Sequence, residues 1–357
     1  QQTPFWIINE QGFRDPDPVS PQKPEGEVRI FVLGGSAAFG QLSPNDQTLV
    51  SYHLEQLLNT RVASQRSNAN RYQPEILPYT ADEVNKVMNR PARIPDRQYR
   101  VINAAVPGYT SGNELALLMQ EISTYSPDII ISLGGYSDLL LPSSQSAADI
   151  PGLDNILEGK GESWTSQASR GFNNWLGRFY LIKGIQRLTG QSSATLAETG
   201  ALNMASNDKS SAQRLATTSA ELDQRIARYQ NHLLQLVRWS SASKKRVIIG
   251  LQPEVTAYSK AKPSAAEAEM LKQLGQPYAD QIQAGYTKLA AAANRAAQSS
   301  ANAKVLNLYE QIGQQDKSGL FVSPEGLSDA GSKMVADRFY GAIATQLALK
   351  PKPFGSP

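Results

Sequence analysis

Three small residues that could take part in chemistry each follow the end of an apolar run. They are Ser36, in a Gly-Gly-Ser turn, Gly108 and Ser137. A serine hydroxyl at a strand-to-helix turn either acts as a nucleophile or satisfies N–H groups of the following helix. The first role needs a base that takes the hydroxyl proton and is itself held in the right tautomer. Nucleophilic chemistry at Ser36 therefore depends on a base elsewhere in the chain.

The supply of imidazole bases is small, because the chain has only two histidines, His53 and His232. His53 falls in the helical pattern of residues 49–58, and His232 falls in another at residues 222–239. We interpret both as ordinary histidines on the flanks of helices. Without a base, the capping role of Ser36 is favoured.

The elements that must position these residues form a regular alternation. Helical patterns separate five short apolar runs, at residues 28–33, 100–104, 128–133, 246–251 and 304–308. Strands that alternate with helices predict parallel crossovers and a doubly wound α/β sheet, in which ligands bind at the carboxyl ends of the strands. Ser36, Gly108 and Ser137 are thus predicted to lie where such a fold places a pocket.

Four segments carry a resemblance to a known family. They are Val28–Gly40 with Gly-Gly-Ser, Val101–Ser111 with Pro-Gly108-Tyr, Pro127–Asp138 with Gly-Gly-Tyr-Ser-Asp, and Gly319–Phe339 with Phe-Val-Ser-Pro-Glu-Gly-Leu-Ser. Together they resemble the conserved blocks of the SGNH (GDSL-type) hydrolases from about Asn9 to Leu349. The resemblance implies a five-stranded parallel sheet of order 2-1-3-4-5, with Ser36 at the nucleophile position and Gly108 and Ser137 at the oxyanion positions.

The same resemblance implies that three of four catalytic side chains are replaced. Ser323 and Gly326 stand where the family has its Asp and His, and Ser137 stands where it has the oxyanion Asn. In serine proteases, loss of the triad costs about 10⁶ in turnover, or about 8 kcal/mol of transition-state stabilisation. Loss of one oxyanion donor costs about 10² to 10³, although the Ser137 hydroxyl could substitute in part. We therefore expect a pseudoenzyme in which no residue is catalytically active.

Further residues follow the strand ends. Tyr109 and Tyr136 are expected at the rim of the pocket. Glu254, after the fourth strand, either faces the old active site or is a solvated loop carboxylate. Asp138 is expected to cap or hydrogen-bond the turn that follows it. The Gly34-Gly35 and Gly134-Gly135 pairs complete no phosphate-binding motif and are explained by tight strand exits.

One insertion, residues 141–209, exceeds what a minimal sheet requires. It contains Trp164 and a cluster at helical spacing that includes Trp175. This cluster either docks as a helix on the core or forms an exposed ridge that binds a partner or a sugar ring. Residues 195–207 are small and polar and are expected to form a mobile loop.

The chain is expected to form a single domain at residues 28–350, with an arm at residues 1–27 and a tail at residues 351–357. The arm contains five prolines, which favour extended conformation. It must lie on a surface. If the chain works as a subunit, we expect the arm, the aromatic insertion or both to be ordered against a different protein. Deletion of residues 1–24 should leave folding intact, because it removes no strand or crossover helix. Residues 59–97 are expected to be a polar surface excursion.

The first residue is Gln rather than Met, so we expect an upstream segment, either a cleaved signal or a membrane anchor, unless the chain was shortened artificially. Relatives with a similar Asn-x-x-Gly-Phe-Arg arm, here ending at Arg14, are often extracytoplasmic bacterial proteins with an N-terminal anchor. The resemblance therefore implies an extracytoplasmic location, in the periplasm, a lumen or at the cell surface.

Composition excludes several classes of function. The 357 residues carry 35 basic and 32 acidic side chains, a net charge of +3, with no basic run that would follow a phosphate backbone, so nucleic-acid binding is not indicated. Cysteine is absent, which excludes disulfides and thiol chemistry, and with two separated histidines neither a metal nor another cofactor is expected. No apolar run reaches the ~18 residues of a membrane helix.

Three hypotheses remain open. The first is an inactive SGNH-like subunit that binds protein partners in a membrane-associated assembly. The second is a module that binds an acylated sugar or a similar ligand without converting it. The third is a serine esterase or O-acyltransferase with a base from an unexpected position.

Overall fold

A five-stranded parallel sheet forms the centre of the computed structural model, which describes residues 6–145, 211–258 and 262–356. Its strands are β1 (Glu27–Gly34), β2 (Gln98–Asn103), β3 (Ile129–Gly134), β4 (Arg246–Leu251) and β5 (Ala303–Asn307). Their order in the sheet is β2-β1-β3-β4-β5, and every neighbouring pair is parallel. The predicted fold class, strand positions and strand order are confirmed.

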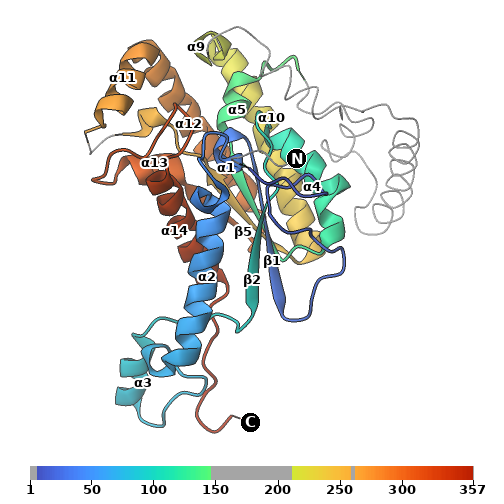
Figure 1. The fold of residues 1–357 in the computed structure, drawn as a ribbon, viewed down its shortest axis with the longest axis vertical. Helices are drawn as coiled ribbons and strands as arrows, with labels where there is room; N and C mark the ends of the chain where they lie inside the picture. The colour runs from blue at the N-terminus through green and yellow to red at the C-terminus, as the bar shows by residue number, and fades with distance from the viewer. Residues whose placement is uncertain (1–5, 146–210, 259–261, 357) are drawn as a thin grey trace.

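Helices cover both faces of the sheet (Figure 1). They are α1 (Ser36–Phe39), α2 (Val50–Ser67), α3 (Ala81–Met88), α4 (Ser111–Gln120), α5 (Tyr136–Leu140), α9 (Ser211–Arg214), α10 (Ser219–Ser243), α11 (Ala265–Leu274), α12 (Gln276–Ala297), α13 (Leu308–Gly313) and α14 (Asp329–Gln346), with 3₁₀ turns at Asp46–Thr48, Ala69–Arg71, Ile122–Tyr125 and Val255–Ala257.

The alternation of side chains along β1 divides the apolar core into two clusters. Phe31 and Leu33 pack with α4, α10 and α12, whereas Ile30 and Val32 pack with α2 and α14. Successive side chains of a strand point to opposite faces, so a strand buried on both sides must be apolar throughout. This explains why the strands read as continuous apolar runs.

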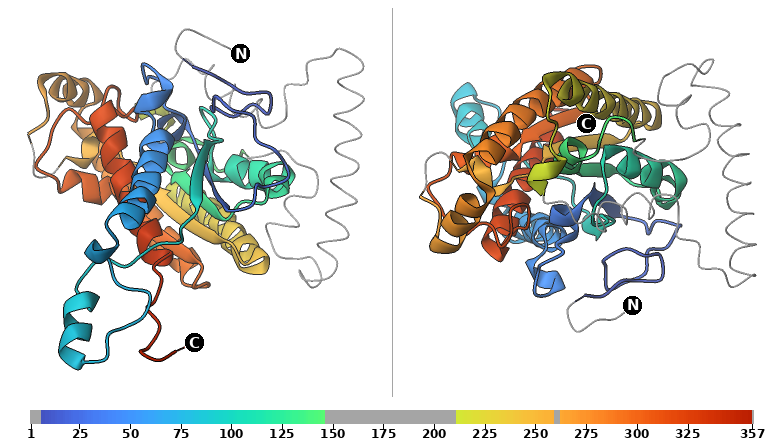
Figure 2. Two further views of the ribbon diagram at one scale, coloured as in Figure 1. Left: turned by 60° about the horizontal axis from the view of Figure 1, so that its bottom comes forward. Right: turned by 90° about the horizontal axis from the view of Figure 1, so that it is seen from above.

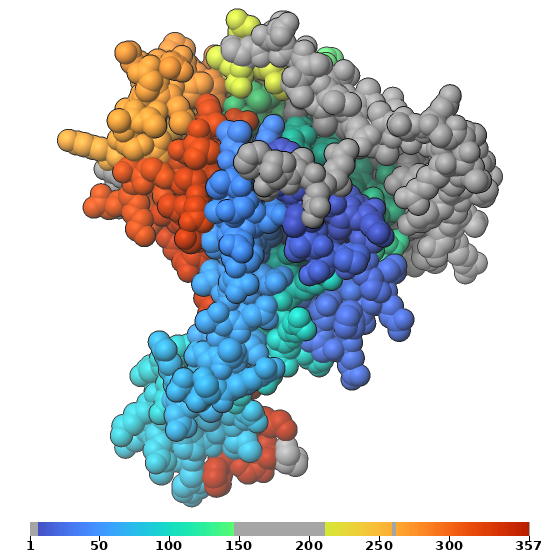
Figure 3. Space-filling view, in the orientation of Figure 1, coloured from blue at the N-terminus to red at the C-terminus, as the bar shows by residue number. Residues whose placement is uncertain are grey.

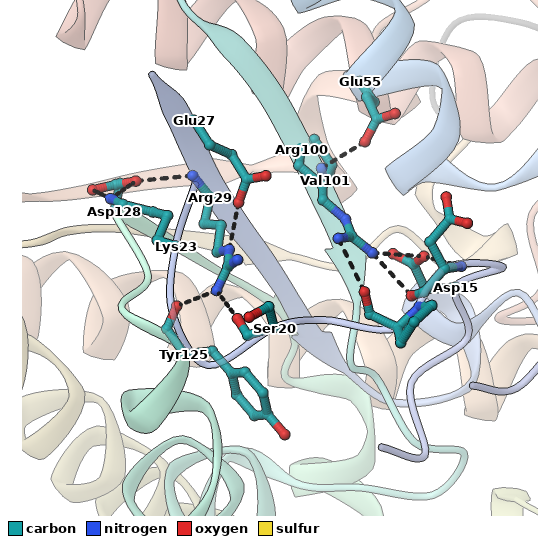
Figure 4. Close-up of polar contacts among 12 residues, drawn as sticks. Asp15, Ser20, Lys23, Glu27, Arg29, Glu55, Arg100, Val101, Tyr125 and Asp128 are labelled. Atoms are coloured by element: carbon teal, nitrogen blue, oxygen red, sulfur yellow. Dashed lines mark hydrogen bonds and ion pairs between the residues drawn. The ribbon is translucent and has the colours of Figure 1, made fainter. Parts of the chain in front are cut away.

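The described part of the N-terminal arm, residues 6–26, lies on the chain's own sheet, which sequence reasoning did not predict. Phe13 and Val19 are buried in the core, and Arg14 bridges to Asn103 of β2. Figure 4 shows the polar contacts that fasten the arm: Asp15 pairs with Arg100 at 3.2 Å and Lys23 with Asp128 at 2.7 Å.

Arg29 of β1 is the most deeply buried cation beneath this arm, with no exposed surface. Its guanidinium donates to the Glu27 carboxylate and to the carbonyl oxygens of Ser20 and Tyr125, as Figure 4 shows. A buried charge must be paired and hydrogen-bonded to be tolerated. Because Ser20 belongs to the arm, the arm completes the environment of Arg29.

A lobe formed by residues 68–97 and 349–356 projects from the body at the far end of α2 (Figures 1 and 3). Main-chain hydrogen bonds join its two segments, from Leu77 N to Lys352 O at 2.8 Å and from Leu349 N to Arg93 O at 2.8 Å. The predicted excursion at residues 59–97 therefore begins later, because α2 continues to Ser67. The left view of Figure 2 shows the same projection from a further direction.

The helical pattern at residues 222–239 lies within α10, which starts at Ser219 with Thr218 as its cap and follows the short α9, which ends at Arg214. The insertion that contains Trp164 and Trp175 lies outside the described residues. Among the residues that are described, no helix has both the length and the apolar character that crossing a membrane requires.

Candidate functional site at the carboxyl ends of the strands

Ser36 opens α1 directly after β1, at a turn made by Gly34 and Gly35. Gly34 has φ +150°, and a Cβ there would lie 2.2 Å from the Leu133 carbonyl oxygen, so only glycine fits. Ser36 is half-buried, and its hydroxyl makes no hydrogen bond with another described residue. The predicted capping role is therefore not observed, and the hydroxyl is left available.

The N-terminal arm stabilises this turn through hydrogen bonds from Arg14. The Arg14 guanidinium donates to the carbonyl oxygens of Phe39, at 3.0 Å, and Gly40, at 2.6 Å, which end α1. It also pairs with Asp46 at 2.7 Å. The Asn-x-x-Gly-Phe-Arg segment thus stabilises the turn that carries Ser36, a contact that sequence reasoning did not predict.

Tyr109, which follows Gly108, and Ser137 lie beside the same turn. A Cβ placed on Gly35 would come within 3.2 Å of the Tyr109 carbonyl oxygen and 3.4 Å of Ser137 Oγ. Gly108 has φ +81°, the left-handed conformation that glycine adopts without strain. The first three blocks of the resemblance therefore meet at one point.

The fourth block contains neither an imidazole nor a carboxylate at its two replaced positions. Ser323 Oγ accepts a hydrogen bond from Gly326 N at 2.9 Å, which closes a local turn. The Pro324 carbonyl oxygen accepts from Val255 N at 2.8 Å and so fastens this turn to the segment after β4. Ser323 and Gly326 are both half-buried, and together they stabilise the local turn of the backbone.

Glu254 is fully buried, so it is not the solvated loop carboxylate that was one of its two interpretations. Its carboxyl group accepts hydrogen bonds from Thr256 N at 2.8 Å, from the Thr256 hydroxyl and from Tyr278 Oη at 3.2 Å. Burial raises the pKa of Glu254 to about 7. Tyr278 Oη also lies 3.0 Å from Tyr136 Oη, so the buried carboxyl connects to the residue before Ser137. Tyr136, like Tyr109, is buried rather than placed at a rim.

Glu325 is a site residue that sequence reasoning missed, although it lies between the two replaced positions. Burial raises the pKa of the Glu325 carboxyl. The charge of Glu325 in turn raises the pKa of Tyr136 and of Glu254, after burial itself. Two carboxyl groups therefore lie close enough to interact at this end of the sheet.

His232 is buried in a hydrogen-bonded chain with Ser111 and Asp138. Ser111 Oγ donates to Asp138 Oδ1 at 2.6 Å, and His232 Nδ1 lies 2.9 Å from the same hydroxyl. Because the single hydroxyl proton goes to Asp138, Nδ1 must carry a proton of its own. Burial and the nearby Arg228 cation lower the pKa of His232 to about 3. The imidazole of His232 is therefore neutral at neutral pH, and its Nδ1 is hydrogen-bonded to Ser111.

Asp138 was expected to bond the turn that follows it, and this expectation is wrong. Its carboxylate accepts from the backbone N of Ser111 at 3.1 Å as well as from the Ser111 hydroxyl. Ser111 begins α4, so Asp138 joins the starts of α5 and α4. The residue has a structural role between two helices.

His53 faces a different part of the molecule. Its Nε2 lies 2.8 Å from Asp329 Oδ1, between α2 and the first turn of α14. It lines a cavity of about 750 Å³ together with Leu320, Lys333 and Arg338. The lining of this cavity includes none of the five positions of the vestigial site, Ser36, Gly108, Ser137, Ser323 and Gly326.

Within residues 6–145, 211–258 and 262–356, no group of three or more His, Cys, Asp or Glu side chains is arranged to hold a metal ion. The chemical groups at this end of the sheet include the Ser36 hydroxyl, the backbone around Gly108 and the buried carboxyl group of Glu254.

The similarity of this chain to known proteins is distant. No family model and no curated protein matches the sequence. Among solved structures, an acetyl xylan esterase, AlAXEase, shares 10% identity over 88% of this chain and 100% of its own, with a TM-score of 0.40. The lipase/acylhydrolase from Enterococcus faecalis shares 13% over 91% and 98% of the chains, with a TM-score of 0.40. A GDSL-like lipase from Parabacteroides merdae shares 10% over 90% and 96%, also at 0.40. At this level of similarity, the strand order of the chain itself is what defines its fold.

Proposed function

We propose that the chain is an SGNH-hydrolase-like protein that has lost catalysis and acts as a structural or interaction subunit of an extracytoplasmic, membrane-associated assembly. The observation that carries the loss of catalysis concerns the histidines. The sequence has two, and each already has a partner away from Ser36: His232 bonds Ser111 and His53 bonds Asp329. A serine without a positioned base is a poor nucleophile.

A second candidate function is a serine esterase or O-acyltransferase with a carboxyl base. The buried Glu254, with its pKa raised to about 7, and the neighbouring Glu325 favour it, because a general base works best when its pKa lies near the operating pH. The intact Ser36 turn supports the same candidate. The third candidate function is that of a module that binds an acylated sugar or a similar ligand without converting it.

A fluorophosphonate probe and a generic aryl ester separate these functions. We expect no labelling of the parent protein beyond that of its Ser36→Ala variant, and equal rates of ester hydrolysis by the two. Strong labelling that Ser36→Ala abolishes would contradict the proposal. In that case Glu254→Gln and Glu325→Gln identify the base, since loss of a general base costs about 10² to 10⁴ in rate.

Restoring the missing side chains tests the same proposal from the other side. We expect the triple variant Ser137→Asn, Ser323→Asp, Gly326→His to hydrolyse the aryl ester about 10²-fold faster than the parent, at the lower end of what a positioned base contributes. A Cβ at Gly326 would lie 2.4 Å from Ser323 Oγ, so the variant requires the side chain at residue 323, itself changed to Asp, to take another rotamer. The control is the triple variant with Ser36→Ala, which should be inactive.

A further inference from the structure

The projecting lobe carries most of the exposed large apolar side chains of the described residues. Of the eight such residues, five lie within 68–97 and 349–356: Ile76, Tyr79, Met88, Leu349 and Phe354. The exposed fraction is 80% for Tyr79 and 62% for Phe354, and these two rings contact each other at 5.2 Å. Concentrated apolar exposure on one part of a surface marks an interaction site.

The lobe is also the basic part of the molecule. The lobe contains seven basic residues (Lys and Arg) and four acidic residues (Asp and Glu). The rest of the chain contains 28 basic and 28 acidic residues. The whole net charge of +3 therefore belongs to the lobe. Five of these basic residues are exposed, namely Arg71, Lys86, Arg97, Lys350 and Lys352.

The short helix α3 is only partly covered by the rest of the lobe. None of its eight residues is buried, although Val84 and Val87 are half-buried and Met88 is exposed. The core of the lobe is small, with Tyr72 and Ile94 as its buried members between residues 68 and 97. The lobe thus exposes more large apolar groups than it buries.

The position of the lobe separates it from the vestigial site. Residues 68–97 run from the end of α2 to Gln98, where β2 begins, so the lobe lies at the amino ends of the parallel strands. Ser36, Gly108 and Ser137 follow the carboxyl ends. Figure 3 shows the lobe as a convex projection that stands clear of the body.

We propose that this lobe docks the protein on an anionic lipid surface, with the Tyr79–Phe354 tip inserted among the headgroups. Amphipathic aromatic side chains favour the membrane–water boundary, and Lys and Arg are attracted to anionic lipids. A convex tip with exposed rings can enter a headgroup layer, whereas a folded partner would need a concave surface to cover it. The body, with Ser36 at its far end, then faces away from the bilayer.

The test is sedimentation of the protein with vesicles of phosphatidylcholine alone or mixed with phosphatidylglycerol. We expect binding to the mixed vesicles only, and loss of binding when salt shortens the screening length to about 3 Å at 1 M. Each basic residue near such a surface is worth about fivefold in the partition coefficient, so Lys86→Glu with Lys350→Glu should weaken binding at least about 25-fold. Tyr79→Ser with Phe354→Ser should also weaken it.

The matched control is Leu42→Ser with Tyr52→Ser, two exposed apolar residues outside the lobe, which should bind like the parent. All of these positions are exposed, so we expect each variant to fold, which circular dichroism checks. The absence of cysteine allows one environment-sensitive dye to be placed at Tyr79→Cys or at Leu42→Cys. We expect a blue shift of emission on the mixed vesicles at residue 79 only.

Three results would overturn the proposal. They are equal binding to both vesicle types, no binding to either, or binding that survives the lobe substitutions. Capture of an acidic protein through the lobe in the absence of vesicle binding would assign the surface to a protein partner instead. None of these results depends on whether Ser36 reacts, so the docking proposal and the loss of catalysis fail separately.

Discussion

Glu114 is a carboxyl group that the fold keeps protonated near neutral pH. It lies in the first turn of α4, and burial raises the pKa of its side chain to about 8. Ser132 Oγ donates to Glu114 Oε2 at 2.5 Å, and the nearby Asp138 charge raises the pKa further. A protonated carboxyl avoids the large penalty of a second buried negative charge beside Asp138.

The raised pKa makes the contribution of Glu114 to stability depend on pH. The unfolded chain releases this proton above pH 4.5, but the folded chain keeps it until about pH 8, so stability falls between these values by about 1.4 kcal/mol per pH unit. Glu114→Gln removes this loss. We expect the variant to gain stability relative to the parent as the pH rises from 5 to 8, measured by urea unfolding at each pH.

When the stability of the variant is compared with that of the parent at each pH, the contributions of the other titrating groups cancel. Glu254 acts in the same direction as Glu114, up to about pH 7, whereas His232 destabilises the fold as pH falls below 6.5 because its folded pKa is about 3. Glu269→Gln, on the exposed side of α11, is the control. A difference between Glu114→Gln and the parent that stays constant with pH would show that Glu114 is ionised in the fold.

For single residues, the sequence predicted some members of the site and missed others, for a physical reason. Ser36, Gly108 and Ser137 were predictable because each follows a strand, and parallel strands bring their carboxyl ends to one edge. The contacts of His232 with Ser111 and of Ser132 with Glu114 join different elements. Such pairs depend on how helices pack on the sheet, which local patterns do not specify.

Among the elements, the N-terminal arm is the one whose role the sequence did not reveal. Its prolines predicted extended backbone, but proline content says nothing about which surface receives the segment. Burial of Phe13 against Phe31, at 5.7 Å between rings, and against Tyr125, also at 5.7 Å, makes the arm part of the core. The arm also supplies the Ser20 carbonyl to the buried Arg29.

We therefore expect the arm to be required for stability, contrary to what its composition suggested. Phe13→Ala should destabilise the fold by about 3 to 4 kcal/mol, the usual cost of removing a buried phenylalanine ring. Deletion of residues 1–24 should cost more, because it also leaves Arg29 short of an acceptor. Chemical unfolding measures both. Ser20→Ala keeps the carbonyl and should be near neutral, and an equally stable deletion would show that the arm is dispensable.

At the scale of the whole molecule, the sheet separates two surfaces with different proposed roles. The Ser36 turn lies at the carboxyl ends of the strands, and the basic, aromatic lobe lies beyond the amino end of β2. The sequence predicted the sheet because its five short apolar runs alternate regularly with helical patterns. It did not predict the lobe, because residues 68–97 and 349–356 are distant in the chain and are joined by tertiary contacts.

This separation predicts that changes at the two ends combine additively. Substitutions more than about 7–10 Å apart that share no partners add to within about 0.5 kcal/mol. The repaired site, with Ser137→Asn, Ser323→Asp and Gly326→His, should therefore bind anionic vesicles like the parent. Adding Lys86→Glu and Lys350→Glu should reduce vesicle binding by the same factor in the repaired and the parent chain, and should leave hydrolysis of a water-soluble aryl ester unchanged. If the lobe substitutions altered ester hydrolysis, the two ends would be coupled through the sheet, and the lobe would have to be regarded as part of the functional site.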